Sequence, residues 1–205
     1  MPVLARTLLA VDRAASIDEI VIAAREEELL TYAQLCKSYG VQKPVKVVPG
    51  GATRTESVLR AALEASEDAV FLAVQDGARP LVTSTLIDDV VAAAQCYHAA
   101  APAIPVTDTI KRAGDDGQAM ETLNRDELRA MQTPQAFQLP LLRRAHELAE
   151  QDGFLGTDDA ALLEHAGLPV YLTLGDKENL KLTTPADMAF GEAILTLRRE
   201  KEALA

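Results

Sequence analysis

An aspartate and an arginine follow a short apolar segment near the middle of the 205-residue chain. Residues 69–74 have the uncharged, largely apolar run that is typical of a buried strand, and Asp76 and Arg79 come just after it. In open α/β sheets, ligands lie beyond the carboxyl ends of the strands. An aspartate there can hold a divalent cation, and an arginine can bind a phosphate in bidentate fashion. The alternative interpretation is a simple Asp-Gly turn followed by a surface charge.

A second polar group occupies a glycine-rich loop that leads into a predicted helix, within residues 49–63. Thr53 and Glu56 match a capping box, which is a complete structural explanation for these two residues. The functional interpretation is a nucleotide site, because glycines let a flat base approach the backbone and polar side chains at a helix start can face the ligand. The candidate residues for such a site are Gly50, Gly51, Arg54 and Ser57.

Five further candidates lie in the second half of the chain. Thr109 and Arg125 lie in a turn-rich segment, and Thr133 belongs to an unusual polar run beside apolar neighbours. Thr157 is expected to cap a helix whose first turn holds two aspartates. Lys181 is expected in a short strand, where a lysine either extends to solvent or binds an anion. Each of these residue types is common on protein surfaces, so none is decisive alone.

The elements that must position these residues alternate between helices and strands. This alternation predicts one α/β domain, residues 1–205, with a doubly wound and mostly parallel sheet. Residues 107–126 break the pattern and predict a β-hairpin around a Gly/Asp-rich turn, with too little apolar content to form a core of its own. Helices are predicted at 2–14, 26–40, 55–66, 83–98, 139–153, 157–167 and 184–204, and strands at 17–24, 45–48, 69–74, 99–106 and 169–175.

Composition narrows the classes of partner. The net charge of −11 argues against nucleic acid as the main partner, since such proteins usually carry a basic balance. The longest uncharged run, residues 90–107, contains two prolines that would break a membrane-spanning helix, and no signal peptide is visible, so a cytoplasmic protein is expected. The histidines fall on predicted helices and are expected at surface or boundary positions: His98, His146 and His165.

The chain begins almost directly in a helix. A doubly wound sheet normally has a strand before its first helix, and the turn between them is the usual phosphate site. Neither a G-x-G-x-x-G pattern nor a Walker loop occurs in the sequence.

Six segments, in this order and at these spacings, resemble the 2-C-methyl-D-erythritol 4-phosphate cytidylyltransferase family over essentially the whole chain. They are "GGATRTESVLRAAL", "VQDGARPLV", "IPVTDTIKR", "RAMQTPQAF", "GTDDAALLEHAG" and "ENLKLTTPADM". The resemblance implies a Rossmann-like nucleotidyltransferase fold and transfer of CMP from CTP to a sugar-alcohol phosphate, with release of pyrophosphate. It also implies Mg²⁺ as cofactor and a homodimer. Catalysis would then consist mainly of charge neutralisation and alignment of two anions.

The same resemblance implies roles for the candidate residues. Asp76 would hold the magnesium, and the glycine-rich loop with Arg54 and Ser57 would contact CTP. The arm, residues 107–126, would reach into the neighbouring subunit's site. Arg125 and Lys181 would be the catalytic pair that positions the acceptor for attack. The residues implied around the acceptor phosphate are Arg79, Thr109, Arg125, Thr133, Thr157 and Lys181.

The sequence departs from the family at its start. Family members begin with a strand and a glycine-rich loop that carries an arginine and a lysine. About 20–25 residues, which make up most of one strand–turn–helix unit, are therefore expected to be absent here. Since loss of one preorganised donor costs on the order of 10²–10³ in rate, we expect little activity and a weakened sheet from the chain as written. Two alternatives stay open: a ribitol-5-phosphate cytidylyltransferase, and a non-catalytic remnant that kept the fold.

Overall fold

The computed structural model describes residues 1–204, and its first unit is a pair of parallel strands with flanking helices. Helix α1 (Val3–Arg13) precedes β1 (Ile20–Ala24), and α2 (Leu29–Ser38) connects β1 to β2 (Val45–Pro49) through a 3₁₀ turn, η1 (Glu26–Glu28). The strands pair in register from Ile20 opposite Val45 to Ala24 opposite Pro49. Leu8, Ile20, Ile22 and Cys36 form the core beneath them, and the strand predicted at 17–24 is present as β1.

The second and larger sheet has five strands and carries the rest of the fold. They are β3 (Phe71–Val74), β4 (Ala99–Pro105), β7 (Arg129–Met131), β8 (Gln135–Gln138) and β9 (Tyr171–Leu174). β7 and β8 follow one another along one edge of β4, β9 pairs with its other edge, and β3 pairs with β8. β9 is parallel to β4, whereas β7 and β8 are antiparallel to it.

The α/β class is confirmed, but the expected mostly parallel sheet is a mixed one divided into two parts. The reason is the path of the chain. After β4 the chain forms the projecting hairpin, and it then runs back antiparallel to β4 as β7 and β8. Sequence reasoning missed both returning strands, because three residues of β7 and four of β8 are too short to show a periodicity.

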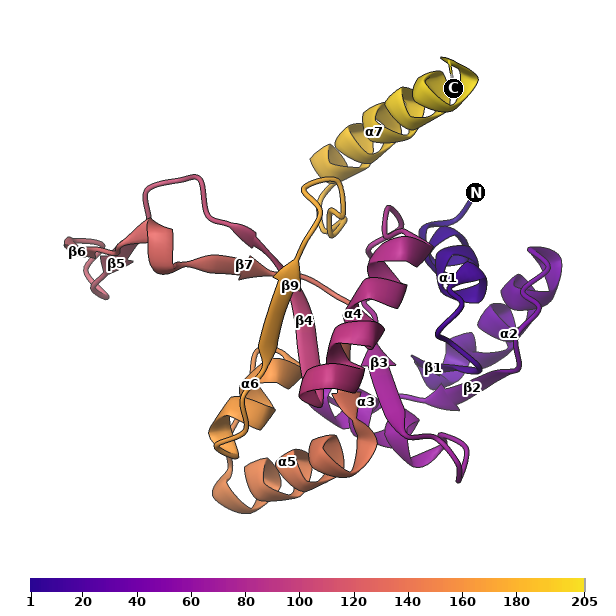
Figure 1. Cartoon of the computed structure of the whole chain (residues 1–205), viewed down its shortest axis with the longest axis horizontal. Helices are drawn as coiled ribbons and strands as arrows, with labels where there is room; N and C mark the ends of the chain where they lie inside the picture. The colour runs from indigo at the N-terminus through magenta and orange to yellow at the C-terminus, as the bar shows by residue number, and fades with distance from the viewer. Residues whose placement is uncertain (205) are drawn as a thin grey trace.

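Helices cover both faces of the large sheet (Figure 1). On one face, α4 (Ser84–Tyr97) packs its residues Ile87, Val90 and Ala94 against Ala100 and Ala136. On the other face, α5 (Leu139–Asp152) and α6 (Asp159–His165) pack around Ala99 and Phe137. Neighbouring residues of one strand therefore face opposite helix layers, which requires strands that are apolar on both sides.

The predicted hairpin is present and projects from the body (Figure 1). β5 (Lys111–Ala113) and β6 (Ala119–Thr122) are antiparallel, and every residue in both strands is exposed. A 3₁₀ turn, η2 (Arg125–Glu127), leads back to β7. This segment, residues 107–126, is called the arm below.

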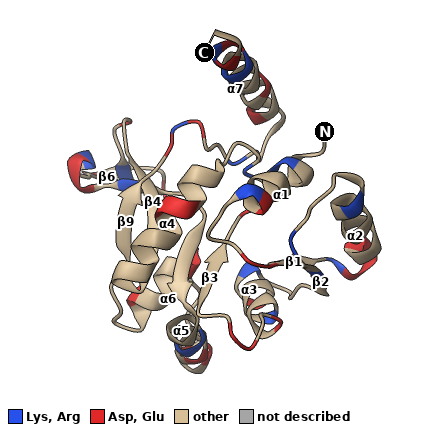
Figure 2. Ribbon diagram, turned by 45° about the vertical axis from the view of Figure 1, so that its right-hand side comes forward, with Lys and Arg blue, Asp and Glu red and all other residues tan. Residues whose placement is uncertain are grey.

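The remaining helices flank the site and the end of the chain. α3 (Arg54–Leu63) follows β2, and α7 (Pro185–Leu204) projects from the body with only Gly191 buried. Acidic and basic residues both occur along α7 (Figure 2), whereas Lys37 is the only charged residue of α2. Within residues 1–204, no helix has both the length and the apolar character needed to cross a membrane.

Candidate active site

Asp76 lies just beyond the carboxyl end of β3 and is surrounded by three cationic side chains. Lys181 Nζ is 3.1 Å and Arg79 Nε is 3.4 Å from its Oδ2, and Arg54 Nε is 3.7 Å from its Oδ1. The cations come from three distant segments: the loop after β9, the turn after β3 and the start of α3. These four residues, Arg54, Asp76, Arg79 and Lys181, are called the Asp76 cluster below.

The cluster keeps Asp76 ionised. Burial alone would raise the pKa of this carboxyl group, since its side chain is only 13% exposed. The hydrogen bond and charge of Lys181, followed by the charges of Arg54 and Arg79, outweigh burial and hold the pKa of Asp76 below its ordinary value. The site therefore combines one carboxylate with three cations.

A second, fully buried carboxylate fixes Arg54 from behind. Arg54 Nη1 donates to Asp159 Oδ2 at 2.8 Å, and Asp159 is 0% exposed. Its other oxygen, Oδ1, has no hydrogen-bond partner within residues 1–204. Burial raises the pKa of Asp159 despite the opposing charge of Arg54. Arg54 thus bridges a buried acid on α6 and the half-open cluster around Asp76.

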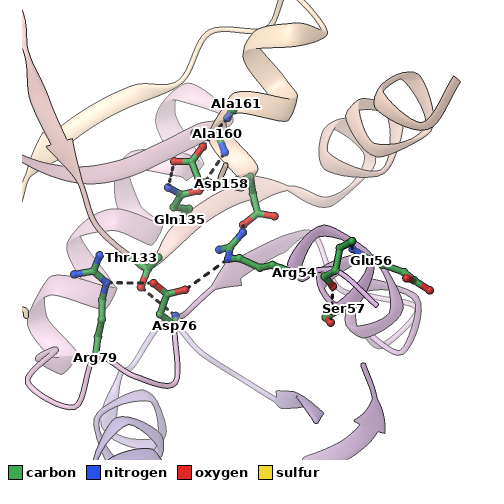
Figure 3. A network of polar contacts seen from close by, with 12 residues as sticks. Arg54, Glu56, Ser57, Asp76, Arg79, Thr133, Gln135, Asp158, Ala160 and Ala161 are labelled. Carbon is green, nitrogen blue, oxygen red and sulfur yellow. Dashed lines mark hydrogen bonds and ion pairs between the residues drawn. The ribbon is translucent and has the colours of Figure 1, made fainter. Parts of the chain in front are cut away.

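The buried side chain of Gln135 holds the start of α6 in place (Figure 3). Its Oε1 accepts from the backbone N–H groups of Asp159 and Ala160 at 3.2 and 3.1 Å, and its Nε2 donates to Asp158 Oδ2 at 2.7 Å. Asp158 Oδ1 caps the helix by accepting from Ala161 N at 2.9 Å. The expected cap at Thr157 is therefore wrong by one residue. Asp158 takes that position, and Thr157 is exposed just before it.

Thr133 connects the returning strands to the cluster. Its Oγ1 accepts from Asp76 N at 3.1 Å, and its carbonyl accepts from the buried Asn179 Nδ2 at 2.9 Å. The carbonyl of Asn179 in turn accepts from Arg79 Nη1 at 2.8 Å. Lys181 follows two residues later in a loop. The expectation of a strand at Lys181 is wrong. Side-chain contacts such as those of Asn179 hold this loop, and backbone hydrogen bonds to a neighbouring strand do not.

The glycine-rich loop adopts the predicted capped geometry. Thr53 Oγ1 accepts from Glu56 N at 3.1 Å, and Gly51 N donates to Ser57 Oγ at 2.9 Å. A Cβ atom at Gly51 would lie 2.3 Å from the Glu56 side chain, so only glycine fits there. Beside this loop is a cavity of about 530 Å³, lined by Ala23, Ala24, Arg25, Glu28, Tyr32, Gly50, Gly51, Thr53 and Ser57.

The structure brings together some of the predicted residues and leaves others apart. Arg54, Asp76, Arg79, Thr133 and Lys181 meet, and Gly50, Gly51 and Ser57 line the adjacent cavity. Thr109 and Arg125 lie exposed on the arm, where Arg125 Nη1 donates to Thr107 O at 2.8 Å. Neither contacts the Asp76 cluster through a hydrogen bond or ion pair in the part of the chain that the structure describes.

Sequence reasoning missed several residues around the site. In the sequence, Asp159 is an acid in the first turn of a predicted helix, and Gln135 is one residue of a polar run, so neither stood out. Arg25, which lines the cavity, comes just after β1, and its position at the end of a strand was a signal like that of Asp76 after β3. His146, expected near the surface, is 4% exposed on α5, and burial followed by the charge of Arg54 lowers its pKa. Its position on the inner face of an amphipathic helix was the signal for that burial.

The composition of the cluster fits a magnesium site completed by substrate. Within residues 1–204, no three His, Cys, Asp or Glu side chains gather to form a metal cage. Mg²⁺ usually binds one or two carboxylates together with substrate phosphates and water. Asp76, ionised and placed among three cations, offers one such carboxylate.

Comparisons with known proteins agree with one another. The family described as 2-C-methyl-D-erythritol 4-phosphate cytidylyltransferase (IspD) matches residues 1–197. The enzyme of that name from Halalkalibacterium halodurans is 45% identical over 202 residues, which span 98% of this chain and 86% of the relative. The one from Bacillus thuringiensis is 40% identical over 200 residues, 98% of this chain and 88% of the relative.

Solved structures give the same result. The 4-diphosphocytidyl-2C-methyl-D-erythritol synthase from Anaerococcus prevotii superposes with a TM-score of 0.88 at 29% identity, over 96% of this chain and 86% of that one. The 2-C-methyl-D-erythritol 4-phosphate cytidylyltransferase from Thermus thermophilus superposes with a TM-score of 0.76 at 34% identity, over 94% and 87%.

Proposed function

Because the chain belongs to the 2-C-methyl-D-erythritol 4-phosphate cytidylyltransferase (IspD) family, we propose that the Asp76 cluster binds the reacting phosphates of its two substrates. The family activity is transfer of CMP from CTP to 2-C-methyl-D-erythritol 4-phosphate in non-mevalonate isoprenoid synthesis. The observation that carries the proposal is the convergence of three cations from distant segments on one carboxylate.

Charge balance explains why such a cluster suits this reaction. An oxygen of the acceptor phosphate attacks the α-phosphorus of CTP and forms a new P–O bond. The bond from that phosphorus to the bridging oxygen breaks, and pyrophosphate leaves with the electron pair. Two anions must meet, so positively charged groups that lower their repulsion accelerate the step. Three cations face two carboxylates, Asp76 and Asp159, which leaves a positive surplus for phosphate oxygens.

Each residue of the cluster has a distinct proposed task. Lys181, whose side chain is 44% exposed, is free to turn from Asp76 to an incoming phosphate. Arg79 is held by Asn179 O and offers its remaining N–H groups from a fixed position. Asp76 would hold Mg²⁺, which supplies further charge neutralisation on the triphosphate when bound. No general base is required, because the attacking phosphate is already ionised.

We propose that the cavity beside the glycine-rich loop takes the cytosine and its ribose. Gly50 and Gly51 line the cavity of about 530 Å³ and carry no side chain that would obstruct a flat base, and Thr53 and Ser57 line it from the start of α3. Ser57 Oγ already donates to Thr53 O at 2.8 Å and accepts from Gly51 N. Its proposed contribution is therefore mainly to shape the loop.

The arm is proposed to form a homodimer and to carry Thr109 and Arg125 into the partner's site. Two features support this: every residue of β5 and β6 is exposed, and neither Thr109 nor Arg125 reaches the cluster of its own subunit. Thr157, exposed before α6, is proposed to contact the acceptor phosphate. A cytoplasmic location stays a prediction.

The test is pyrophosphate release with CTP, magnesium and methylerythritol phosphate, with ribitol 5-phosphate run alongside. Because little activity is expected from the chain as written, the same assay is run on an N-terminally extended version. Release that depends on methylerythritol phosphate, and that Asp76→Asn reduces on the order of 10²-fold or more, supports the proposal. Asp89→Asn, at an exposed position of α4, is the matched control and should leave the rate unchanged. Equal rates for the Asp76 and Asp89 variants would contradict the role of the cluster, and preference for ribitol 5-phosphate would contradict the acceptor.

A further inference from the structure

Two cations of the Asp76 cluster are carried by loops. Arg79 lies in residues 75–83, between β3 and α4, and Lys181 lies in residues 175–184, between β9 and α7. These two loops are called the arginine turn and the lysine loop below. Contacts to phosphate oxygens are directional, so cations that hold one reacting group must keep fixed positions relative to each other. The fold must therefore hold the two loops together.

The two loops bond directly to each other at two points. Leu182 N donates to Ala78 O at 2.8 Å, and Arg79 Nη1 donates to Asn179 O at 2.8 Å. Two points define a line, so these bonds alone leave the loops free to rotate about it. A further contact between the loops is needed to fix their relative orientation.

Arg198 of α7 supplies that contact, because its guanidinium bridges the two loops. Its Nε donates to Glu178 Oε2 at 2.8 Å, and its Nη2 lies 3.7 Å from Asp176 Oδ2, both in the lysine loop. Its Nη1 donates to Leu81 O at 3.0 Å in the arginine turn. The Arg198 side chain is only 24% exposed, so these contacts are partly sheltered from water. A planar guanidinium holds three such partners in a fixed arrangement.

The contact of Arg198 lies close to the site along the chain. Glu178 directly precedes Asn179, whose carbonyl accepts from Arg79, and it lies three positions before Lys181. A displacement of Glu178 therefore moves both the group that holds Arg79 and the backbone that carries Lys181.

The rest of α7 contacts the body weakly, which makes the position of Arg198 specific. Gly191 is the only buried residue of α7, and a Cβ atom placed there would lie 3.6 Å from the Leu182 side chain. Arg198 follows seven positions later, on the same face of the helix. The next residue, Arg199, is exposed and, within residues 1–204, bonds only to residues of α7 itself.

We propose that Arg198 is a positioning residue for the transfer of the cytidylyl group. From α7 it locks the lysine loop to the arginine turn and thereby sets the position of Lys181 relative to Arg79. All three of its nitrogen atoms already have partners, so it acts through the loops and does not touch substrate. This role rests on the proposed function of the Asp76 cluster. Loss of Arg198 leaves the charge of the site in place but not its alignment.

The first test measures backbone amide exchange on the whole chain without substrate. Arg198→Ala should speed exchange at Leu182 N, which bonds to Ala78 O, by about tenfold or more, because the two loops separate more often. Arg199→Ala removes the same charge from the same helix and should leave that exchange unchanged. Exchange at Ala136, in the centre of the large sheet, should be unchanged in both variants. Unchanged exchange at Leu182 in Arg198→Ala would overturn the proposal.

The second test measures pyrophosphate release on the N-terminally extended version. Arg198→Ala should lower kcat about tenfold with a smaller change in KM for CTP, because the binding groups remain but are misaligned. Arg199→Ala should match the unchanged chain. Glu178→Gln should cause part of the same loss and add little to it in combination with Arg198→Ala, since both variants break one contact.

The two tests separate a failure of this inference from a failure of the proposed function. Fully additive losses for Glu178→Gln and Arg198→Ala, or a rise in KM for CTP with unchanged kcat, would overturn the positioning role. If the unchanged extended version releases no pyrophosphate, the proposed function fails, and with it the positioning role. The exchange at Leu182 then still shows whether Arg198 holds the two loops together.

Discussion

Arg54 and Asp159, 105 positions apart in the sequence, form a 2.8 Å ion pair in which the acid is fully buried and the arginine reaches the site. The pair links the start of α3, beside the glycine-rich loop, to the start of α6. Since Gln135 holds the backbone of Asp159, the guanidinium of Arg54 is anchored on one side and reaches the carboxylate of Asp76 on the other. We infer that Asp159 positions Arg54 and does not touch substrate itself.

Replacing Asp159 should weaken CTP binding more than it slows turnover. Asp159→Asn removes the charge that orients Arg54, so we expect KM for CTP to rise about tenfold with a smaller change in kcat. The free energy of unfolding should fall by about 1–3 kcal/mol, less than for a fully buried pair because Arg54 is 35% exposed. Urea titration and steady-state kinetics measure the two effects. Asp152→Asn, at an exposed pair with His165, is the control, and an equal rise in KM there would contradict the positioning role.

The stability of the chain should depend on Asp76 at acid pH. The folded pKa of Asp76 lies below its model-compound value of 3.8, so its ionised form stabilises the folded state above that pH. This contribution is lost as the pH falls from about 3.8 through the folded pKa. The free energy of unfolding is measured between about pH 2.5 and pH 6, the range in which carboxylates titrate. As the pH is lowered, it should fall more steeply for the unchanged chain than for Asp76→Asn. Parallel curves would contradict the ion-pair assignment.

Lys181 should matter for the reaction and little for stability. Its side chain is 44% exposed, and such an ion pair contributes about 0–1 kcal/mol. Because Lys181 is also the main cation that lowers the pKa of Asp76, Lys181→Ala should lower the free energy of unfolding, by about 1 kcal/mol or less. Loss of a preorganised cation should lower kcat/KM on the order of 10²–10³-fold. The rate is followed by pyrophosphate release, with CTP binding measured calorimetrically in parallel. Lys177→Ala, an exposed lysine of the same loop, should match the unchanged chain in both measurements.

Much of the fold could be predicted from the sequence because its signals are local. Apolar periodicity located α1 to α4 and β1 to β4, and the Gly/Asp-rich turn located the arm. Asp76 and Arg79 could be singled out because residues after a buried strand meet at one edge of a sheet. The motif order then gave the family, which the comparisons confirm.

Other features depend on contacts between distant segments. β8 is a buried central strand, yet it contains the polar residue Gln135. The side-chain amide of Gln135 forms hydrogen bonds with the start of α6, which satisfies its polar atoms inside the protein. Lys181 was expected in a strand, but the loop that carries it is held by Asn179, whose partner Thr133 lies 46 positions earlier. Asp159 looked like an ordinary first-turn acid, since only the folded chain brings Arg54 to it.

The proposed dimer can be tested by mixing two defective chains. Asp76→Asn removes the carboxylate of the body, and Arg125→Ala removes the guanidinium of the arm, so each variant alone should have little activity. If the arm enters the partner's site, a mixed dimer contains one intact site that combines Asp76 of one chain with Arg125 of the other. Random assortment makes about half of the dimers mixed, so co-expression should restore about a quarter of the activity of the unchanged chain.

The arm should leave the stability of the subunit body unchanged. Replacing residues 111–122 by a short Gly-Ser linker removes only exposed strand residues and their turn, so the free energy of unfolding extrapolated to the separated subunit should change by about 0.5 kcal/mol or less. Sedimentation should then give half the mass of the unchanged chain. If co-expression restores no activity, or if the linker variant sediments like the unchanged chain, the arm does not complete the partner's site, and Arg125 must act within its own subunit or not at all.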